Sequence, residues 1–236
     1  MPTLIIANKC HSSWSLRPWL LMKEFGLPFD EVLIPFMDPI ASQEWKAEVR
    51  KHNPGGKVPA LVDGDIQVGE SIAIMEYLAD THPDLAIWPK DRAARAMARS
   101  ISAEMHAGFQ ALRGACPMNL GKKYGAKDRG PAVAKDVARV AEIWTTARRR
   151  FGASSGEAGG PFLFGRFSAA DAMFAPVATR FETYSLPADA VGRAYMDAVL
   201  GTAGFQEWRK AALAETWIVP EDEVDEEPIA VFRKAA

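Results

Sequence analysis

Residues 57–78, with the sequence KVPALVDGDIQVGESIAIMEYL, decide how the first part of this chain folds. Val58 to Val62 is a short β-branched run that predicts a strand, and the turn pair Asp63-Gly64 leads into another strand at Ile66 to Val68. Apolar residues then recur at helical spacing from Ser71 to Leu78. The stretch therefore predicts an antiparallel hairpin that is followed directly by a helix.

The residues before this hairpin complete a sheet. Thr3 to Ala7 is short and β-branched, which predicts a buried strand, and a helix from Ser15 is expected to stop at Gly26. Phe29 to Pro35 predicts a second strand, which a short helical or irregular piece follows. The order β-α-β-α-β-β-α implies a mixed sheet with helices packed on it.

The rest of the chain is predicted to be helical. Residues 82–89 contain prolines that indicate a linker, and after them few stretches have the pattern of a β-strand. We expect an α/β domain over residues 1–81, an all-helical domain over residues 90–215, and an acidic, mobile tail over residues 216–236. Helix stops are predicted near four glycines, Gly121, Gly125, Gly152 and Gly204.

The strongest of these helix ends is RRRFG at residues 148–152. Three cations in a last helical turn complement the partial negative charge there, and Gly152 can take a left-handed cap. A nucleic-acid patch is the alternative explanation for the cations. No aromatic interleaving or further basic stripe accompanies them, which argues against that alternative.

Composition excludes several classes of protein. With 48% hydrophobic and 25% charged residues the chain can bury enough surface to fold, and no apolar run approaches the roughly 20 residues that a bilayer demands. A formal net charge of −2 argues against a nucleic-acid binder.

Leu4 to Ala7 is too short for a signal peptide, so we expect a cytoplasmic protein. Cys10 and Cys116 form no CxxC pair and the histidines lack metal-ligand spacing, so no metal site is expected.

Cys10 to Trp19, between the first strand and the first helix, is the first segment with candidate chemistry. Its serines Ser12, Ser13 and Ser15 suit helix N-caps. The same position at a helix N-terminus favours anions, so a hydroxyl there can instead donate a hydrogen bond to a sulfur that a ligand supplies. Both interpretations stay open at this point.

Two further segments precede a strand and a helix. Pro59 either begins an edge strand or follows a cis peptide bond that turns the Val58 backbone toward a ligand, and Lys57 is either solvated or paired with a ligand carboxylate. Ser71 is either a simple N-cap or, with the helix N–H groups, a carboxylate site, in which case Glu70 would pair with an adjacent ammonium group.

Together these segments resemble the glutathione S-transferase superfamily. The resemblance is carried by residues 12–17 (SSWSLR), 57–61 (KVPAL) and 70–78 (ESIAIMEYL), and by residues 165–171 (GRFSAAD), which resemble the capping box of the family. It spans essentially residues 1–215. It implies a thioredoxin-like N-terminal domain, an all-helical C-terminal domain, glutathione as co-substrate, and a homodimer.

The resemblance also implies which residues bind glutathione. Val58, beside a cis Pro59, would bind the cysteinyl part through its backbone, and Lys57 would approach the glycyl carboxylate. Glu70 and Ser71 would hold the γ-glutamyl amine and carboxylate.

The SSxSxR pattern is similar to the serine-using zeta and tau classes, which makes Ser12 the residue that activates the thiol and Ser13 its rival. Cysteine-using relatives place their cysteine five residues before the equivalent of Arg17. Cys10 lies two residues too early, so we expect a buried bystander there. Arg17 itself is expected in a structural ion pair or exposed, with a contribution to the potential at the thiolate as the alternative.

The electrophile site is expected between the domains. Four apolar residues recur at helical spacing on one predicted helix, and we expect them mainly to pack in the hydrophobic core: Met105, Phe109, Leu112 and Cys116. The more polar edge of that helix, His106 and Arg113, can reach the cleft, and Phe109 is included as a candidate.

The resemblance implies a glutathione transferase that conjugates small hydrophobic electrophiles. The alternatives are a zeta-like isomerase of maleylacetoacetate, a glutathione-dependent reductase, and a non-catalytic glutathione- or ligand-binding protein. Trp14 replaces the cysteine in the SSCS motif of the zeta class, which weakens the isomerase alternative.

Overall fold

The computed structural model describes residues 1–36, 42–152 and 159–233. The predicted β-α-β-α-β-β-α order is confirmed, and the short piece that was expected to be helical or irregular is a helix. The elements are β1 (Thr3–Ile6), α1 (Ser13–Glu24), β2 (Asp30–Leu33), α2 (Gln43–Arg50), β3 (Ala60–Asp63), β4 (Ile66–Gly69) and α3 (Ser71–Thr81).

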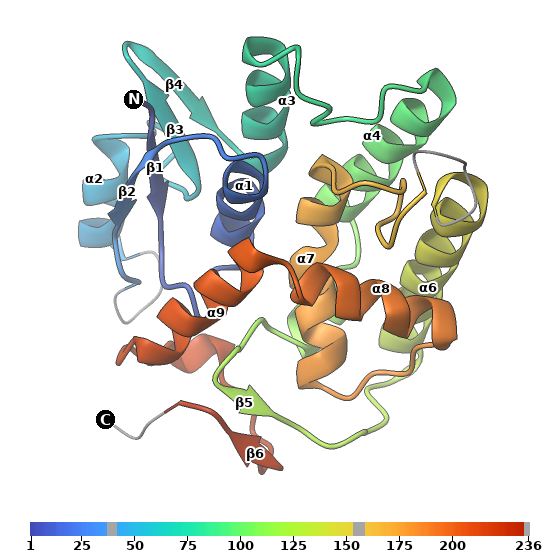
Figure 1. Ribbon diagram of the computed structural model, residues 1–236. Coiled ribbons are helices and arrows are strands. Elements are labelled where there is room, and N and C mark those ends of the chain that lie inside the picture. The colour runs from blue at the N-terminus through green and yellow to red at the C-terminus, as the bar shows by residue number, and fades with distance from the viewer. Residues whose placement is uncertain (37–41, 153–158, 234–236) are drawn as a thin grey trace.

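The sheet has the strand order β2-β1-β3-β4, with β1 parallel to β2 and the other neighbours antiparallel. Because side chains alternate along a strand, the side chains of β1 pack into two hydrophobic cores, one on each face of the sheet. Leu4 and Ile6 face the core that holds α1 and α3, whereas Ile5 packs with Trp45 and Val49 of α2 on the other face. Figure 1 shows α2 alone on its side of the sheet, with α1 between the sheet and the helical domain.

Helices dominate the second half of the chain. They are α4 (Arg92–Ala107), α5 (Gln110–Ala115), α6 (Pro131–Phe151), α7 (Ala169–Thr183), α8 (Ala190–Leu200) and α9 (Ala203–Ala214). Helix α7 is central (Figure 1), and every residue from Ala169 to Phe181 is buried. It packs against α1, α4 and α8, so it joins the two domains.

The start of α7 confirms the predicted capping box. The Asp171 carboxylate accepts the backbone N–H of Ser168 at 2.9 Å and that of Leu163 at 3.0 Å. Burial raises the pKa of Asp171 to about 6, although these hydrogen bonds oppose the shift. The local sequence signal therefore fixed the first turn of the central helix.

Two helix-end predictions need correction. Helix α6 ends beside Gly152 as expected, but Gly152 has φ −91° and is not left-handed. An added Cβ there would lie 2.7 Å from the Arg148 carbonyl oxygen, so close approach, and not handedness, favours glycine. Gly204 lies in the first turn of α9 and stops no helix.

The apolar stripe from Met105 to Cys116 does not lie on one helix. Helix α4 ends at Ala107, and Phe109 has a left-handed backbone (φ 59°) before α5 begins. All four stripe residues are buried, so they are core as expected. The break turns α5 and its Arg113 relative to α4.

The C-terminal tail differs from the mobile segment that the sequence predicts. Residues 220–222 form a short 3₁₀ helix, and β6 (Ala230–Val231) pairs with β5 (Lys122–Lys123). Arg129 donates to both carboxylate oxygens of Glu226, at 2.6 and 2.9 Å. In Figure 1 this segment runs back beneath α9 to the helical domain.

Candidate active site

A cavity of about 580 Å³ lies where the two domains meet. It brings together residues that are far apart in the sequence, from the loop before α1, from α2, from the segment before β3, and from α5, α7 and the C-terminal tail. Its lining includes Ser12, Ser13, Trp14, Lys46, Arg50, Lys57, Val58, Arg113, Arg180 and Asp222. The structure thus gathers the serine segment and the lysine–proline segment at one place.

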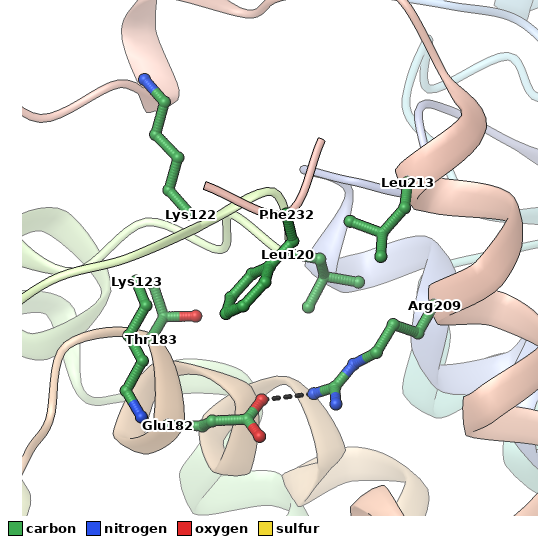
Figure 2. Close-up of a pocket in the computed structure, with 8 residues that line it drawn as sticks. All are labelled: Leu120, Lys122, Lys123, Glu182, Thr183, Arg209, Leu213 and Phe232. Carbon is green, nitrogen blue, oxygen red and sulfur yellow. Dashed lines mark hydrogen bonds and ion pairs between the residues drawn. The ribbon is translucent and has the colours of Figure 1, made fainter. Parts of the chain in front are cut away.

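A second, smaller cavity of about 160 Å³ contains none of the predicted site residues. Figure 2 shows it between Phe232, Leu120 and Leu213, with an ion pair from Arg209 to Glu182 on one side. The domain-interface cavity is the candidate active site, because Ser12, Ser13 and Lys57 line it, whereas Glu70 and Ser71 are not among its lining residues.

Ser12 precedes α1 at the N-cap position, but its side chain caps no helix N–H. Its hydroxyl donates instead to Ser15 Oγ at 2.7 Å, and Ser15 Oγ accepts the backbone N–H of Ala7 at 3.2 Å. The rival Ser13 accepts a hydrogen bond from Arg180 Nη2 at 3.4 Å. Both serines line the cavity, and the capping explanation fails for Ser12.

The segment before β3 has the cis Val58–Pro59 peptide bond that one of the two interpretations required. Val58 lines the cavity, whereas Pro59 is buried behind it. Asn53 Nδ2 donates to the Lys57 carbonyl oxygen at 2.7 Å, which fixes the backbone beside the lysine. Lys57 itself is largely exposed, and its ammonium group lies 3.7 Å from Glu70 Oε1.

Glu70 and Ser71 form the N-terminus of α3. Glu70 has a positive φ of 64°, a conformation that is unusual outside glycine and that concentrates at functional sites. The Ser71 side chain is fully buried, and its hydroxyl has no hydrogen-bond partner among the described residues. A buried hydroxyl without a partner at a helix N-terminus is suited to an anionic ligand group.

Arg17 is buried and forms no ion pair with a described residue, contrary to the expectation from sequence. It is 1% exposed, its Nε donates to the Met173 carbonyl oxygen at 3.2 Å, and no described residue accepts from Nη1. Its guanidinium lies 3.8 Å from the centre of the Trp14 ring, and that of Arg113 lies at 4.7 Å. Burial, with the charges of Arg180 and Arg113, lowers the pKa of Arg17 well below its usual value.

The three electrophile candidates occupy different positions. Arg113 lines the cavity, and burial lowers its pKa. His106 lies 5.2 Å from Trp14, centre to centre, and its Nε2 is 3.7 Å from Glu70 Oε2, so it borders the site. Phe109 is buried in the core and does not line the cavity.

Arg180 and Asp222 line the cavity, although the sequence did not indicate either of them. Arg180 is 5% exposed in the apolar helix α7, where its guanidinium donates to the Cys116 and Pro176 carbonyl oxygens. Asp222 belongs to the segment that was expected to be mobile. No local signal identifies either residue, because only packing brings them to Ser12.

Positive charge therefore dominates this cavity. Of the described residues that line it, one, Asp222, has a carboxylate, and six have cationic or protonatable side chains: His11, Lys46, Arg50, Lys57, Arg113 and Arg180. Cys10 is buried nearby, its Sγ 3.8 Å from Asn119 Oδ1.

Across the described ranges, no group of three His, Cys, Asp or Glu side chains is arranged to hold a metal. None of the helices there has the length and apolar character to cross a bilayer.

Relatives of known name share parts of this chain. A probable maleylacetoacetate isomerase of Caenorhabditis elegans is 38% identical over 112 residues, 47% of this chain and 49% of the relative. A zeta-class glutathione S-transferase of Euphorbia esula is 27% identical over 58% of this chain and 60% of its own length. The chain thus spans about half to three fifths of the curated relatives that it matches.

Solved structures share the fold over nearly the whole chain. A glutathione transferase homologue from Burkholderia, solved with bound glutathione, covers 89% of this chain and 97% of its own, with a TM-score of 0.64 and 21% identity. A diazinon-metabolizing glutathione S-transferase of Bombyx mori covers 90% and 97%, with a TM-score of 0.67 and 16% identity.

Two family models match the two domains. Residues 11–81 match the glutathione S-transferase N-terminal domain, and residues 130–212 match the C-terminal domain. Both matches agree with the thioredoxin-like sheet and the helical half, so this chain belongs to the glutathione S-transferase superfamily.

Proposed function

We propose that the chain binds glutathione at the N-terminus of α3 and along the segment before β3. The γ-glutamyl carboxylate accepts from the Ser71 hydroxyl and the α3 N–H groups, and the amine pairs with Glu70. The Val58 backbone holds the cysteinyl part, and Lys57 approaches the glycyl carboxylate. The buried Ser71 hydroxyl without a partner carries this proposal, since a ligand oxygen would satisfy it.

Ser12 is then the residue that activates the thiol. Its hydroxyl donates a hydrogen bond to the sulfur, and the N-terminus of α1 adds favourable potential. Lowering a thiol pKa by two units requires about 2.7 kcal/mol of preferential thiolate stabilisation. One charge-assisted hydrogen bond and a helix terminus together supply an energy of that order.

The reaction is addition of the thiolate to a small electrophile. The sulfur lone pair forms the S–C bond, the displaced electron pair moves to the acceptor atom, and that atom takes a proton from water. The cationic lining favours an electrophile with a carboxylate over the purely hydrophobic one that the sequence suggests, because Arg113 and Arg180 would pair with it.

Isomerisation is the second candidate, and the names of the relatives favour it. It shares the first step: the thiolate adds to a double bond, the resulting single bond rotates, and elimination returns the thiolate. The two candidates differ in whether glutathione is consumed. A non-catalytic binding protein would show neither outcome. A homodimer and a cytoplasmic location stay predictions.

Titration of bound glutathione tests the proposal. The wild-type chain should be retained on immobilised glutathione, and the thiolate absorbance of the complex should titrate well below that of free glutathione. Ser12→Ala should move this titration toward the free value, whereas Ser13→Ala should not. An unchanged titration in Ser12→Ala would disprove the role of Ser12, and absence of binding would disprove the function. Glutathione consumption with a carboxylate-bearing unsaturated substrate then separates transferase from isomerase.

A further inference from the structure

The loop that leads into Ser12 is held by residues from the other end of the chain. The Glu215 carboxylate accepts the backbone N–H groups of Lys9, at 2.6 Å, and Cys10, at 3.0 Å. Trp208 Nε1 donates to the Lys9 carbonyl oxygen at 2.8 Å. Residues 9–10 therefore have three of their backbone polar groups fixed by two side chains, that of Trp208 within α9 and that of Glu215 at its C-terminus.

Glu223 lies at ion-pair distance from the next residue of that loop, His11. Its Oε1 lies 3.8 Å from His11 Nε2, and the His11 side chain is fully buried. The same carboxylate accepts from Asn119 Nδ2 at 3.0 Å and from Lys122 Nζ at 2.6 Å. Its interactions with His11 and Lys122 lower the pKa of Glu223 to about 2, so it is ionised at neutral pH.

The segment that carries these carboxylates, residues 215–233, is anchored at both ends. Arg233 donates to the Glu215 carbonyl oxygen at 2.9 Å, and the backbone N–H of Phe232 donates to the Gly121 carbonyl oxygen at 2.8 Å. Figure 2 shows the Phe232 ring directed toward Leu120 and Thr183. Such anchoring makes the segment a fixed support.

We propose that Glu215 and Glu223 are positioning residues that set the direction of the Ser12 hydroxyl through residues 9–11. This inference rests on the proposed role of Ser12 as thiol activator. Both glutamates lie outside residues 11–81 and 130–212, which the family models match. The 215–233 segment also delivers Asp222 to the cavity lining, so it contributes directly to the site.

A matched pair of variants tests the inference in a Cys116→Ala background, which leaves Cys10 as the single thiol. Glu223→Gln removes the charge that faces His11. Glu226→Gln removes a carboxylate three residues later that pairs with Arg129 and does not touch the loop. Two quantities are measured: the titration of the bound glutathione thiol, and the rate at which a thiol reagent modifies buried Cys10.

Glu223→Gln should raise the thiol pKa by about one unit, lower kcat about tenfold at neutral pH, and leave the KM for glutathione within about twofold. Cys10 modification should accelerate about tenfold, because opening of the loop exposes the thiol. Glu226→Gln should match the parent chain in every measurement. Glu223→Asp should recover part of the loss, which a disrupted fold would not allow.

Equal Cys10 reactivity and equal thiol titration in the two Gln variants would overturn the inference. Glu215→Gln gives a second test should Glu223→Gln fail to fold: it should expose Cys10 in the same way, and an unchanged Cys10 rate would count against the inference. If the parent chain itself binds no glutathione, the proposed function fails, while the Cys10 rates still decide whether these glutamates hold the loop.

Discussion

Ser12 and Ser15 share a hydrogen bond of 2.7 Å across the first turn of α1. Ser15 Oγ also accepts the Ala7 backbone N–H, and both Ser15 and Ala7 are fully buried. When the Ser12 hydroxyl donates its hydrogen bond to a ligand sulfur, the Ser15 hydroxyl can rotate and donate a hydrogen bond to Ser12 Oγ. A hydroxyl that accepts one hydrogen bond donates the next one more strongly, so Ser15 supports the activating serine.

Ser15→Ala should therefore weaken both the fold and thiol activation. The buried Ala7 N–H loses its acceptor, which costs about 1–3 kcal/mol of unfolding free energy. The pKa of bound glutathione should rise, but by less than in Ser12→Ala. Chemical denaturation and thiol titration measure the two effects. Ser100→Ala, at an exposed position of α4, is the control, and equal stability of the two variants would contradict the prediction.

Ser71→Ala should have effects of opposite sign on stability and binding. In the free chain the buried hydroxyl has no described partner, so its removal should leave the unfolding free energy unchanged or raise it. With glutathione the carboxylate loses a donor, so affinity should fall about tenfold, equivalent to about 1.4 kcal/mol. Calorimetric titration and thermal unfolding check this, and a destabilised variant with unchanged affinity would contradict it.

The backbone of Glu70 gives a third prediction. Holding a residue with a side chain at φ 64° costs on the order of 1–3 kcal/mol, and glycine avoids most of that cost. Glu70→Gly should thus be more stable than Glu70→Ala, although both should lose glutathione affinity to a similar extent. Denaturation and binding measurements on the two variants suffice. Glu70→Ala with the higher stability would show that the backbone is not strained.

Local signals explain which features could be predicted from the sequence. The Asp63-Gly64 signal predicted the hairpin, although its two-residue turn is Gly64-Asp65 because Asp63 pairs with Ile66. The Ser168–Asp171 pair predicted the start of α7, because a capping box acts within a few residues. The local pattern at the start of α1 left Ser12, Ser13 and Ser15 open, and only the family resemblance selected Ser12, whose role stays a prediction. Glycine at 108 was the available signal for the break in the apolar stripe, but the left-handed Phe109 is a conformation that local propensity does not favour.

The parts that escaped prediction depend on contacts between distant residues. Arg180 lies in a helix whose alanine-rich pattern indicates core, and it enters the site only because α7 packs against α1. The acidic composition of residues 220–236 indicates mobility. In the structure two of those acids form ion pairs, Glu223 with Lys122 and Glu226 with Arg129, and composition carries no information on such pairing.

Arg113 should select for anionic electrophiles. A guanidinium-to-carboxylate hydrogen bond contributes about 1.5–3 kcal/mol, so Arg113→Gln should lower kcat/KM for a carboxylate-bearing electrophile about 10- to 100-fold. A neutral analogue with the same reactive group should lose less than about threefold. Steady-state kinetics with the two substrates make the comparison, with exposed Arg92→Gln as the control. Equal losses for both substrates would mean that Arg113 acts through structure alone.

The His11–Glu223 pair should make the stability of the fold depend on pH. Burial lowers the pKa of His11, but its interactions with Cys10 and Glu223 outweigh burial and raise the value to about 9. Because the folded pKa exceeds the ordinary 6.5, this contribution is complete below about pH 6.5 and is lost as pH rises through 9. The lowered pKa of Glu223 makes its own contribution complete above about pH 4.5, and that contribution is lost toward pH 2.

The unfolding free energy should accordingly fall by a few kcal/mol between about pH 6 and pH 9.5 in the wild type, and by clearly less in His11→Gln. The titratable groups that face His11 are Cys10, Glu215, Asp222 and Glu223. Denaturant unfolding at several pH values measures the slope, and His52→Gln serves as the control, since His52 lies outside this network. A wild-type slope that His11→Gln leaves unchanged would show that another group binds the proton, and that Glu223 holds the loop without help from a charged imidazole.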